Sequence, residues 1–271
     1  MARILLPTDF SESAMHAAEY AVQLFGAQGN SFLLLHVFFD NSVGAPMVAS
    51  WTPELYTILQ EDLRTFAQRF KQRSGAEGVE ENVVFGVISS TIHLAAKEKS
   101  ADHIVMGAQG ISGLGALLLG STTTDVINFA LVPVLVVPGQ TPLARPSRIL
   151  LADDHEDVVV RDLAPLRRIA QVCGAEVIVA HVELDDPDGS DHWSQGIYEI
   201  GLTDVKHSFT EAHGLDVVDG LERAAKHRKV GMIAVLHRHL GFLKGLFHRS
   251  ETKHLALHTE LPLLVLQHTD V

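Results

Sequence analysis

The chain has little of several residue types, and each scarcity excludes a class of protein. It carries one cysteine, Cys173, in 271 residues, which excludes an internal disulfide framework, and we expect this thiol to be buried at a helix end. Basic residues are outnumbered, and the net charge of −12 is shared equally by the two halves, which argues against a general nucleic-acid or anionic-membrane surface. No apolar stretch is long enough to span a bilayer.

Recognisable targeting and catalytic signals are also missing. Arg3 is followed by only three apolar residues before Pro7, which is too short for a secretory signal, so we expect a cytoplasmic protein. The sequence contains neither a G-x-S-x-G elbow nor an H-E-x-x-H pair. We therefore assign no catalytic residue and no metal ligand.

What the chain does contain is an internal repeat. Three segments of the first half return in the second half in the same order. The first two return 145 residues later and the third 129 residues later, so the second copy is shorter in its middle. A linker bearing proline and glycine separates the copies, which predicts two domains, 1–140 and 146–271. The matching pairs are Arg3–Asp9 with Arg148–Asp154, His36–Val37 with His181–Val182, and Leu131–Val137 with Glu260–Leu266.

Inside the first copy, apolar runs alternate with segments of helical periodicity. Strands that are apolar along their length and separated by helices indicate a parallel sheet covered on both faces. The predicted fold class is α/β, with two tandem copies of a five-stranded, Rossmann-like αβα sandwich. In the first copy we expect strands at 2–6, 31–38, 82–87, 103–106 and 133–137, and helices at 11–26, 53–73, 91–99 and 121–130.

The segment from Met106 to Ser121 carries the most specific signal in the chain. Gly107 and Gly110 are separated by two residues, and nine more lead to the pair Gly120-Ser121. An apolar strand precedes this segment and a threonine-rich helix start follows it. Glycines let main-chain N–H groups approach an anion, and a helix N-terminus favours negative charge. The alternative is an ordinary structural loop packed by the leucines at 114 and 117–119.

Other polar residues follow the first two predicted strands. Asp9 comes directly after the first strand, and His36 and Val37 end the second. Because ligands of parallel sheets bind beyond the carboxyl ends of the strands, these residues and the glycine segment are expected at one edge. For Asp9 a helix-capping role is the alternative, and His36 is expected to be structural rather than catalytic.

Together these residues resemble the nucleotide motif of the universal stress protein family, and the whole chain looks like a tandem member. The family motif is a glycine, two residues, a glycine, nine residues and Gly-Ser or Gly-Thr, which this chain matches in the first copy alone. The resemblance implies an adenine nucleotide α-hydrolase-like fold. It also implies that segments 133–137 and 262–266 pair edge to edge, and it leaves a further homodimer open.

The resemblance implies a ligand and a role for each site residue. ATP or AMP would bind in the first domain, with Mg²⁺ accompanying ATP as an option held by Ser121 and Thr122. The protein would be a nucleotide-dependent regulatory or protective module of the stress response; a slow ATPase and a ligand-free scaffold are the alternatives. The phosphates would be held by Gly107, Gly110, Gly120, Ser121 and Thr122, and the nucleoside by Pro7, Thr8, Asp9 and Val37, with Met106 lining the pocket.

The second copy lacks the glycine motif. Alignment places Leu236, His239 and Arg249 where the first copy has glycine, so we expect no nucleotide there. The segment His237–Arg249 mixes basic side chains, histidines and apolar residues. We leave three interpretations open: a solvated or partner-facing loop, an anion site, or a metal site built from histidines at 237, 239 and 248 or at 254 and 258.

Overall fold

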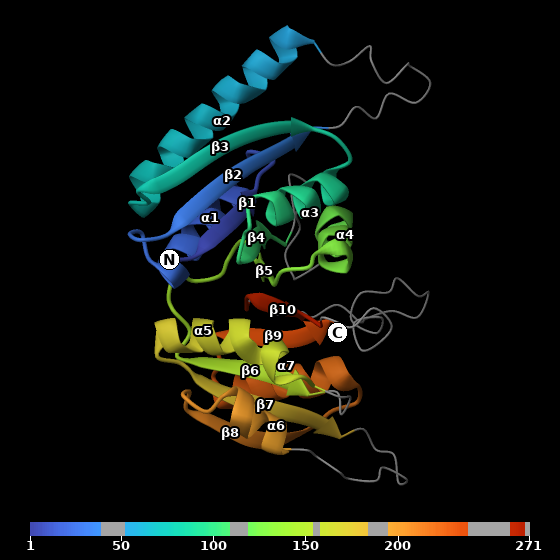
Figure 1. Ribbon diagram of the computed structural model, residues 1–271. Coiled ribbons are helices and arrows are strands. Elements are labelled where there is room, and N and C mark those ends of the chain that lie inside the picture. The colour runs from blue at the N-terminus through green and yellow to red at the C-terminus, as the bar shows by residue number, and fades with distance from the viewer. Residues whose placement is uncertain (39–51, 109–118, 154–157, 184–194, 238–260, 269–271) are drawn as a thin grey trace. The chain divides into compact units, whose positions relative to one another are not determined.

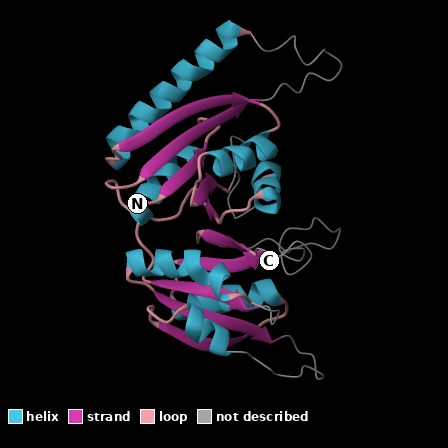
Figure 2. Cartoon of the chain, viewed as in Figure 1, coloured by secondary structure: helices cyan, strands magenta, loops and turns pink. Residues whose placement is uncertain are grey.

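The computed structural model describes residues 1–38, 52–108, 119–153, 158–183, 195–237 and 261–268, and the chain divides into two compact units. The chain passes from the first unit to the second between Gly139 and Gln140, and the second unit also takes in Leu119. Strands and helices alternate along both units (Figures 1 and 2). Among the described residues, no helix is both long enough and apolar enough to cross a membrane.

The first unit is a parallel sheet with the strand order β3-β2-β1-β4-β5. Helices α1 and α2 contact each other, and α3 and α4 form the other contacting pair. The strand order reverses beside β1, which is the position where sheets of this kind bind ligands. The elements are β1 (Arg3–Pro7), α1 (Glu12–Phe25), β2 (Ser31–Phe38), α2 (Pro53–Ser74), β3 (Gly78–Phe85), α3 (Ile88–Glu98), β4 (His103–Gly107), α4 (Ser121–Phe129) and β5 (Val134–Val137).

Local sequence explains where the helices of this unit begin and end. The Ser11 side chain accepts a hydrogen bond from the Ala14 N–H at 3.1 Å and so caps α1, which begins one residue later than predicted. Thr52 caps α2 in the same way, Pro53 occupies its first turn, and Gly75 ends it in the left-handed conformation. Strands β1, β4 and β5 are buried along most of their length, as a sheet covered on both faces requires.

The second unit repeats this plan with the order β10-β9-β6-β7-β8, and every pair within it is parallel. The predicted α/β class with two five-stranded copies is confirmed. The elements are β6 (Arg148–Asp153), the 3₁₀ helix η1 (Val160–Leu163), α5 (Ala164–Cys173), β7 (Glu176–Glu183), α6 (Gln195–Gly201), β8 (His207–His213), α7 (Val217–Arg228), β9 (Met232–His237) and β10 (Leu263–Gln267).

Strand register reproduces the offsets of the sequence repeat. Arg3 lies opposite Ser31 in the first unit, and Arg148 lies opposite Glu176 in the second, 145 residues later on both strands. The pair Ile104 and Val134 is matched by Ile233 and Leu263, 129 residues later on both strands. The repeat therefore extends to individual backbone positions.

Two predicted boundaries and one predicted side chain differ from the structure in detail. Strand β3 runs from Gly78 to Phe85 rather than over 82–87, and α3 begins at Ile88 rather than at 91. Cys173 ends α5 as expected but is only partly buried. Burial nevertheless raises the pKa of its thiol to about 11, so the thiol is protonated at neutral pH.

Candidate functional site

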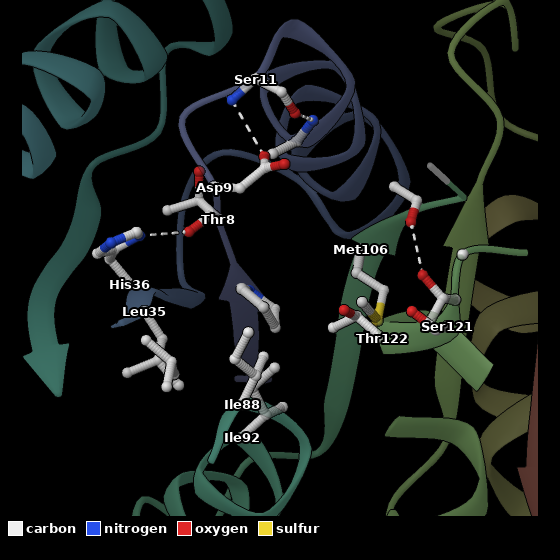
Figure 3. A pocket seen from close by; sticks show the side chains of 16 residues that line it. Thr8, Asp9, Ser11, Leu35, His36, Ile88, Ile92, Met106, Ser121 and Thr122 are labelled. Carbon is white, nitrogen blue, oxygen red and sulfur yellow. Dashed lines mark hydrogen bonds between the residues drawn. The ribbon is translucent and has the colours of Figure 1, made fainter. Parts of the chain in front are cut away.

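A pocket of about 330 Å³ lies in the first unit, beyond the carboxyl ends of β1, β2 and β4 and beside the start of α4 (Figure 3). Nine of the ten site residues predicted from the sequence line it. The tenth, Gly110, lies outside the described residues. The lining residues are Pro7, Thr8, Asp9, Ser11, Ala14, Leu35, His36, Val37, Ile88, Ile92, Met106, Gly107, Gly120, Ser121, Thr122 and Thr123.

The loop between β1 and α1 forms one wall through a chain of short hydrogen bonds. The Thr8 N–H donates to the Leu35 carbonyl at 2.9 Å, and the Phe10 N–H donates to the Thr8 hydroxyl at 3.0 Å. The exposed Asp9 carboxylate accepts from the Ser11 N–H at 3.1 Å. Asp9 is not the N-cap of α1, which is Ser11, but its carboxylate stabilises the turn that leads into the helix.

The backbone of Val37 faces the pocket side of β2. The Leu35 carbonyl bonds toward β1, and the Phe38 carbonyl accepts from the Gly86 N–H at 3.2 Å just beyond β3. Because successive residues of a strand turn their peptide groups to opposite sides, Val37 faces the same side as Leu35. Strand β1 has already ended at Pro7, so the peptide edge of Val37 faces the place where a ligand would continue the ladder.

The two described glycines of the motif differ in what requires them. A Cβ on Gly107 would lie 2.5 Å from the Ser13 Oγ and 3.2 Å from the Ser13 carbonyl oxygen, so α1 packs directly on this backbone. Among the described residues, a Cβ on Gly120 would meet only the Ala108 carbonyl oxygen, at 3.8 Å. Gly120 has φ −61° and ψ 156°, which any residue adopts easily. Neither the backbone conformation nor packing against the described residues demands glycine at position 120.

Helix α4 starts at the pocket without a side-chain cap. Its first internal hydrogen bond runs from the Thr124 N–H to the Gly120 carbonyl at 3.0 Å. The helix therefore has no carbonyl of its own to accept from the N–H groups of residues 121–123. The Thr123 hydroxyl donates to the Gly107 carbonyl at 3.3 Å and ties the helix start to β4. Ser121 is exposed, and the first turn carries no acidic residue. The arrangement suits an incoming anion.

The pocket has almost no formal charge of its own. Its described lining contains no lysine or arginine, and Asp9 and His36 are its titratable side chains. Burial lowers the pKa of His36, an effect opposed by its hydrogen bond to the Thr8 carbonyl and by the negative charge of Asp9. The imidazole is therefore neutral at neutral pH, and helix α4 supplies the attraction for an anion.

An apolar wall completes the pocket, and only part of it was predicted. Met106 was expected from the family resemblance. Leu35 and the α3 residues Ile88 and Ile92 were not expected, but all three line the pocket, and Figure 3 shows Ile88 and Ile92 next to each other. Ile92 is fully buried, whereas Ile88 is partly exposed at the rim. A flat apolar ring could lie against these side chains.

The corresponding positions of the second unit are filled differently. Leu236 stands where the first unit has Gly107 and is buried. Asp153 stands at the position of Thr8 and accepts a buried hydrogen bond from the Tyr198 hydroxyl. Of the predicted segment His237–Arg249, only His237 lies within the described residues, at the buried end of β9. The described part of the chain contains no group of three side chains that could hold a metal ion.

Fold and pocket together define a class. This is a tandem α/β protein with a polar main-chain pocket at the switch point of its first parallel sheet. The model of the Universal stress protein family matches residues 1–138, and the chain belongs to this family.

Known proteins similar to this chain agree with that assignment. A universal stress protein of Methanocaldococcus jannaschii, MJ0531, is 35% identical over 141 residues, covering 50% of this chain and 81% of the relative. A second from the same organism, MJ0577, is 29% identical over 50% of this chain and 93% of its own length. The crystal structure of a universal stress protein from Archaeoglobus fulgidus covers 98% of both chains with a TM-score of 0.76, and at 21% identity it shows a shared fold.

Proposed function

We propose that the first unit binds an adenine nucleotide, ATP or AMP, and that this makes the protein a nucleotide-dependent regulatory or protective module of the stress response. The phosphates would lie at the start of α4, and the nucleoside between the β1–α1 loop and the end of β2. In this position the phosphates would contact the residues of the glycine motif and the start of α4, namely Gly107, Gly110, Gly120, Ser121 and Thr122. The nucleoside would contact residues at the ends of β1, β2 and β4, namely Pro7, Thr8, Asp9, Val37 and Met106.

Gly120 is the observation that carries this proposal. Its backbone could belong to any residue, and no described residue crowds the space of its missing side chain. It nevertheless lies in the pocket lining at the N-cap of α4, where serine, threonine, aspartate or asparagine would stabilise the helix better. A ligand that needs the bare main chain explains the glycine, because a side chain here would occupy the place of the phosphate.

The two walls of the pocket match the two ends of a nucleotide. An anion could accept hydrogen bonds from the N–H groups at the start of α4, where the helix dipole favours negative charge. The described lining contains no lysine or arginine that would add to this attraction. A purine ring finds the apolar wall formed by Leu35, Ile92 and Met106 and could pair with the peptide edge of Val37. Mg²⁺ brought with ATP would meet the exposed Ser121 hydroxyl and that of Thr122.

Binding rather than rapid turnover fits this set of residues. Phosphoryl transfer needs a positioned base and cationic stabilisation of the moving group. The only carboxylate in the described lining is that of Asp9, which already accepts the Ser11 N–H. We therefore propose that the nucleotide acts as a bound ligand, and the same preparation should be assayed for ATP turnover.

A substitution at Gly120 tests the phosphate position. Gly120→Asp places a negative charge at the N-cap, and Gly120→Asn places a neutral side chain of the same size there. Both can cap α4, so both should keep or slightly raise the free energy of unfolding, by a few tenths of a kcal/mol or more. We expect Gly120→Asp to weaken ATP and AMP binding by at least about tenfold more than Gly120→Asn does.

Adenosine serves as the ligand control in equilibrium titrations monitored by fluorescence or calorimetry. Because adenosine carries no phosphate, its affinity should differ little between the Asp and Asn variants. Equal ATP affinity in wild type and Gly120→Asp would remove the proposed phosphate site. Absence of any adenine-nucleotide binding to the folded wild-type protein would remove the proposed function.

A further inference from the structure

Phe10 has an unusual backbone for a residue with a large side chain. Its φ is +66°, in the left-handed region that glycine normally occupies. For other residues this conformation costs about 1–2 kcal/mol, and it persists only where the surroundings hold it. Phe10 directly follows Thr8 and Asp9, which line the pocket, so whatever holds Phe10 also shapes the pocket wall.

The side chain of His36 makes two contacts that hold this loop. Its Nδ1 lies 2.8 Å from the Thr8 carbonyl oxygen (Figure 3). Its ring stacks on the ring of Phe10, with centroids 4.3 Å apart and planes 23° from parallel. The ring of Phe10 also lies near that of the buried Phe66 of α2, with centroids 6.1 Å apart. The loop is thus fixed from β2 and α2 at once.

The first contact also fixes the protonation of the imidazole. A carbonyl oxygen can only accept, so Nδ1 must carry a hydrogen and donate it to Thr8. In a neutral ring this leaves Nε2 without a proton, which is the minor tautomer of histidine in water. The charged groups that act on the ring are Asp9 in the loop and Asp62 on α2, both of which favour protonation, whereas burial opposes it.

We propose that His36 is a positioning residue of the nucleotide pocket: through its Nδ1–H on the Thr8 carbonyl and its ring against Phe10, it holds Thr8 and Asp9 in the conformation that receives the nucleoside. The proposal rests on the proposed function of the same pocket. It assigns a task to a histidine that its sequence position alone suggested was merely structural. Of the two contacts, the hydrogen bond should contribute more to holding the loop than the ring stacking does. Losing the hydrogen bond leaves a partly buried carbonyl without its donor.

Two substitutions separate the hydrogen bond from the ring. His36→Asn keeps an N–H donor close to the position of Nδ1 and loses the ring, whereas His36→Phe keeps a ring against Phe10 and loses the donor. At a temperature where all proteins are folded, we expect ATP affinity to stay within about threefold of wild type in His36→Asn. In His36→Phe we expect a loss of about tenfold. Wild-type affinity in folded His36→Phe would overturn the proposal.

Nuclear magnetic resonance gives a readout that does not depend on a ligand. Long-range nitrogen–proton correlations of the wild-type imidazole should show the Nδ1-protonated tautomer, and the Nε2-protonated form would overturn the proposal. Hydrogen exchange of the Phe10 and Ser11 amides, which donate to Thr8 and Asp9, should be about tenfold faster in His36→Phe than in His36→Asn.

These measurements separate the two proposals. If wild type binds no adenine nucleotide but shows the Nδ1 tautomer and the exchange difference, His36 holds the loop as proposed, but the proposed ligand is wrong. If wild type binds ATP but neither His36 variant alters affinity or exchange, the ligand stands and the positioning role falls.

Discussion

At the scale of single residues, Gly107 and Gly120 show that one motif can contain glycines kept for different reasons. Gly107 gives α1 room, since Ser13 lies against its backbone. Gly120 lies at the N-cap of α4, where no described residue crowds the position of a Cβ. Substituting Gly107 should therefore change stability as well as the proposed ligand contact, whereas substituting Gly120 should change the proposed ligand contact with little effect on stability.

Gly107→Ala should destabilise the protein. The new Cβ would lie 2.5 Å from the Ser13 Oγ and 3.3 Å from the Ser13 carbonyl carbon; the hydroxyl can rotate away, but the backbone must shift. Overpacking of this kind costs about 1–3 kcal/mol, which urea unfolding would detect as a lower midpoint. Adding Ser13→Ala should recover part of the loss. An unchanged midpoint in Gly107→Ala would contradict the close approach of α1 to β4.

His36 should make stability depend on pH in a defined window. Burial lowers its pKa from the ordinary value of 6.5, so the unfolded chain takes up this proton first as the pH falls. The stabilising effect of the neutral ring is fully present above about pH 7, is lost as the pH falls below 6.5, and levels off below the folded pKa. The free energy of unfolding of His36→Asn should fall less over this window, and parallel curves for the two proteins would contradict the assignment.

At the scale of elements, an ion-pair network joins α1 to α2. Arg69 and Arg73 on α2 both bond Glu12, whose side chain is 66% exposed, and Arg73 also bonds Glu19, whose side chain is 6% exposed. Exposed pairs stabilise little, whereas a buried carboxylate that loses its partner is costly. The contribution of each arginine to the free energy of unfolding should therefore increase with the burial of the carboxylate that it pairs with.

Arg73→Met and Arg69→Met test this difference as a matched pair. Removing Arg73 strands the buried Glu19 carboxylate and should lower the free energy of unfolding by about 2 kcal/mol, because Arg73 itself is half exposed and its pair is partly screened. Removing Arg69 should cost less than about 1 kcal/mol. Chemical denaturation compares the two, and Glu19→Gln combined with Arg73→Met should recover stability. Equal losses from both arginines would refute the argument.

The elements best predicted from the sequence were those with a strong local signal. Strand β2 is one continuous apolar run, and α2 starts with a threonine cap and a proline, so both matched closely. The start of α3 was missed because its N-cap, Val87, makes no side-chain hydrogen bond. The first half of β3 was missed because it is a glycine followed by mostly exposed and acidic residues, which carry no apolar pattern.

The candidate site shows the same division between local and non-local information. Motif spacing predicted that Gly107, Gly120 and Ser121 lie together, and all three line the pocket, because they belong to one strand end and one helix start. It could not identify Ile88 and Ile92, which reach the pocket only because α3 crosses the sheet from β3 to β4. The left-handed backbone of Phe10 left no signal either, since nothing in its sequence context calls for that conformation.

At the scale of the whole molecule, two copies of one fold differ at the place where the first is proposed to bind. Matching register puts the buried Leu236 at the position of Gly107. A leucine side chain thus stands where the first unit exposes bare backbone to α1 and the pocket. We propose that the two units are domains, 1–140 and 146–271, of which only the first keeps a ligand site.

This asymmetry predicts the stoichiometry of binding to the full chain. Calorimetric titration with ATP or AMP should give about one nucleotide per chain, because a Cβ-bearing residue at the Gly107 position narrows the approach to the main chain in the second unit. Gly120→Asp should weaken this single binding event by at least about tenfold more than Gly120→Asn does, since no second site remains to take up the nucleotide. Two sites per chain, or one site whose affinity Gly120→Asp leaves unchanged, would contradict the asymmetry.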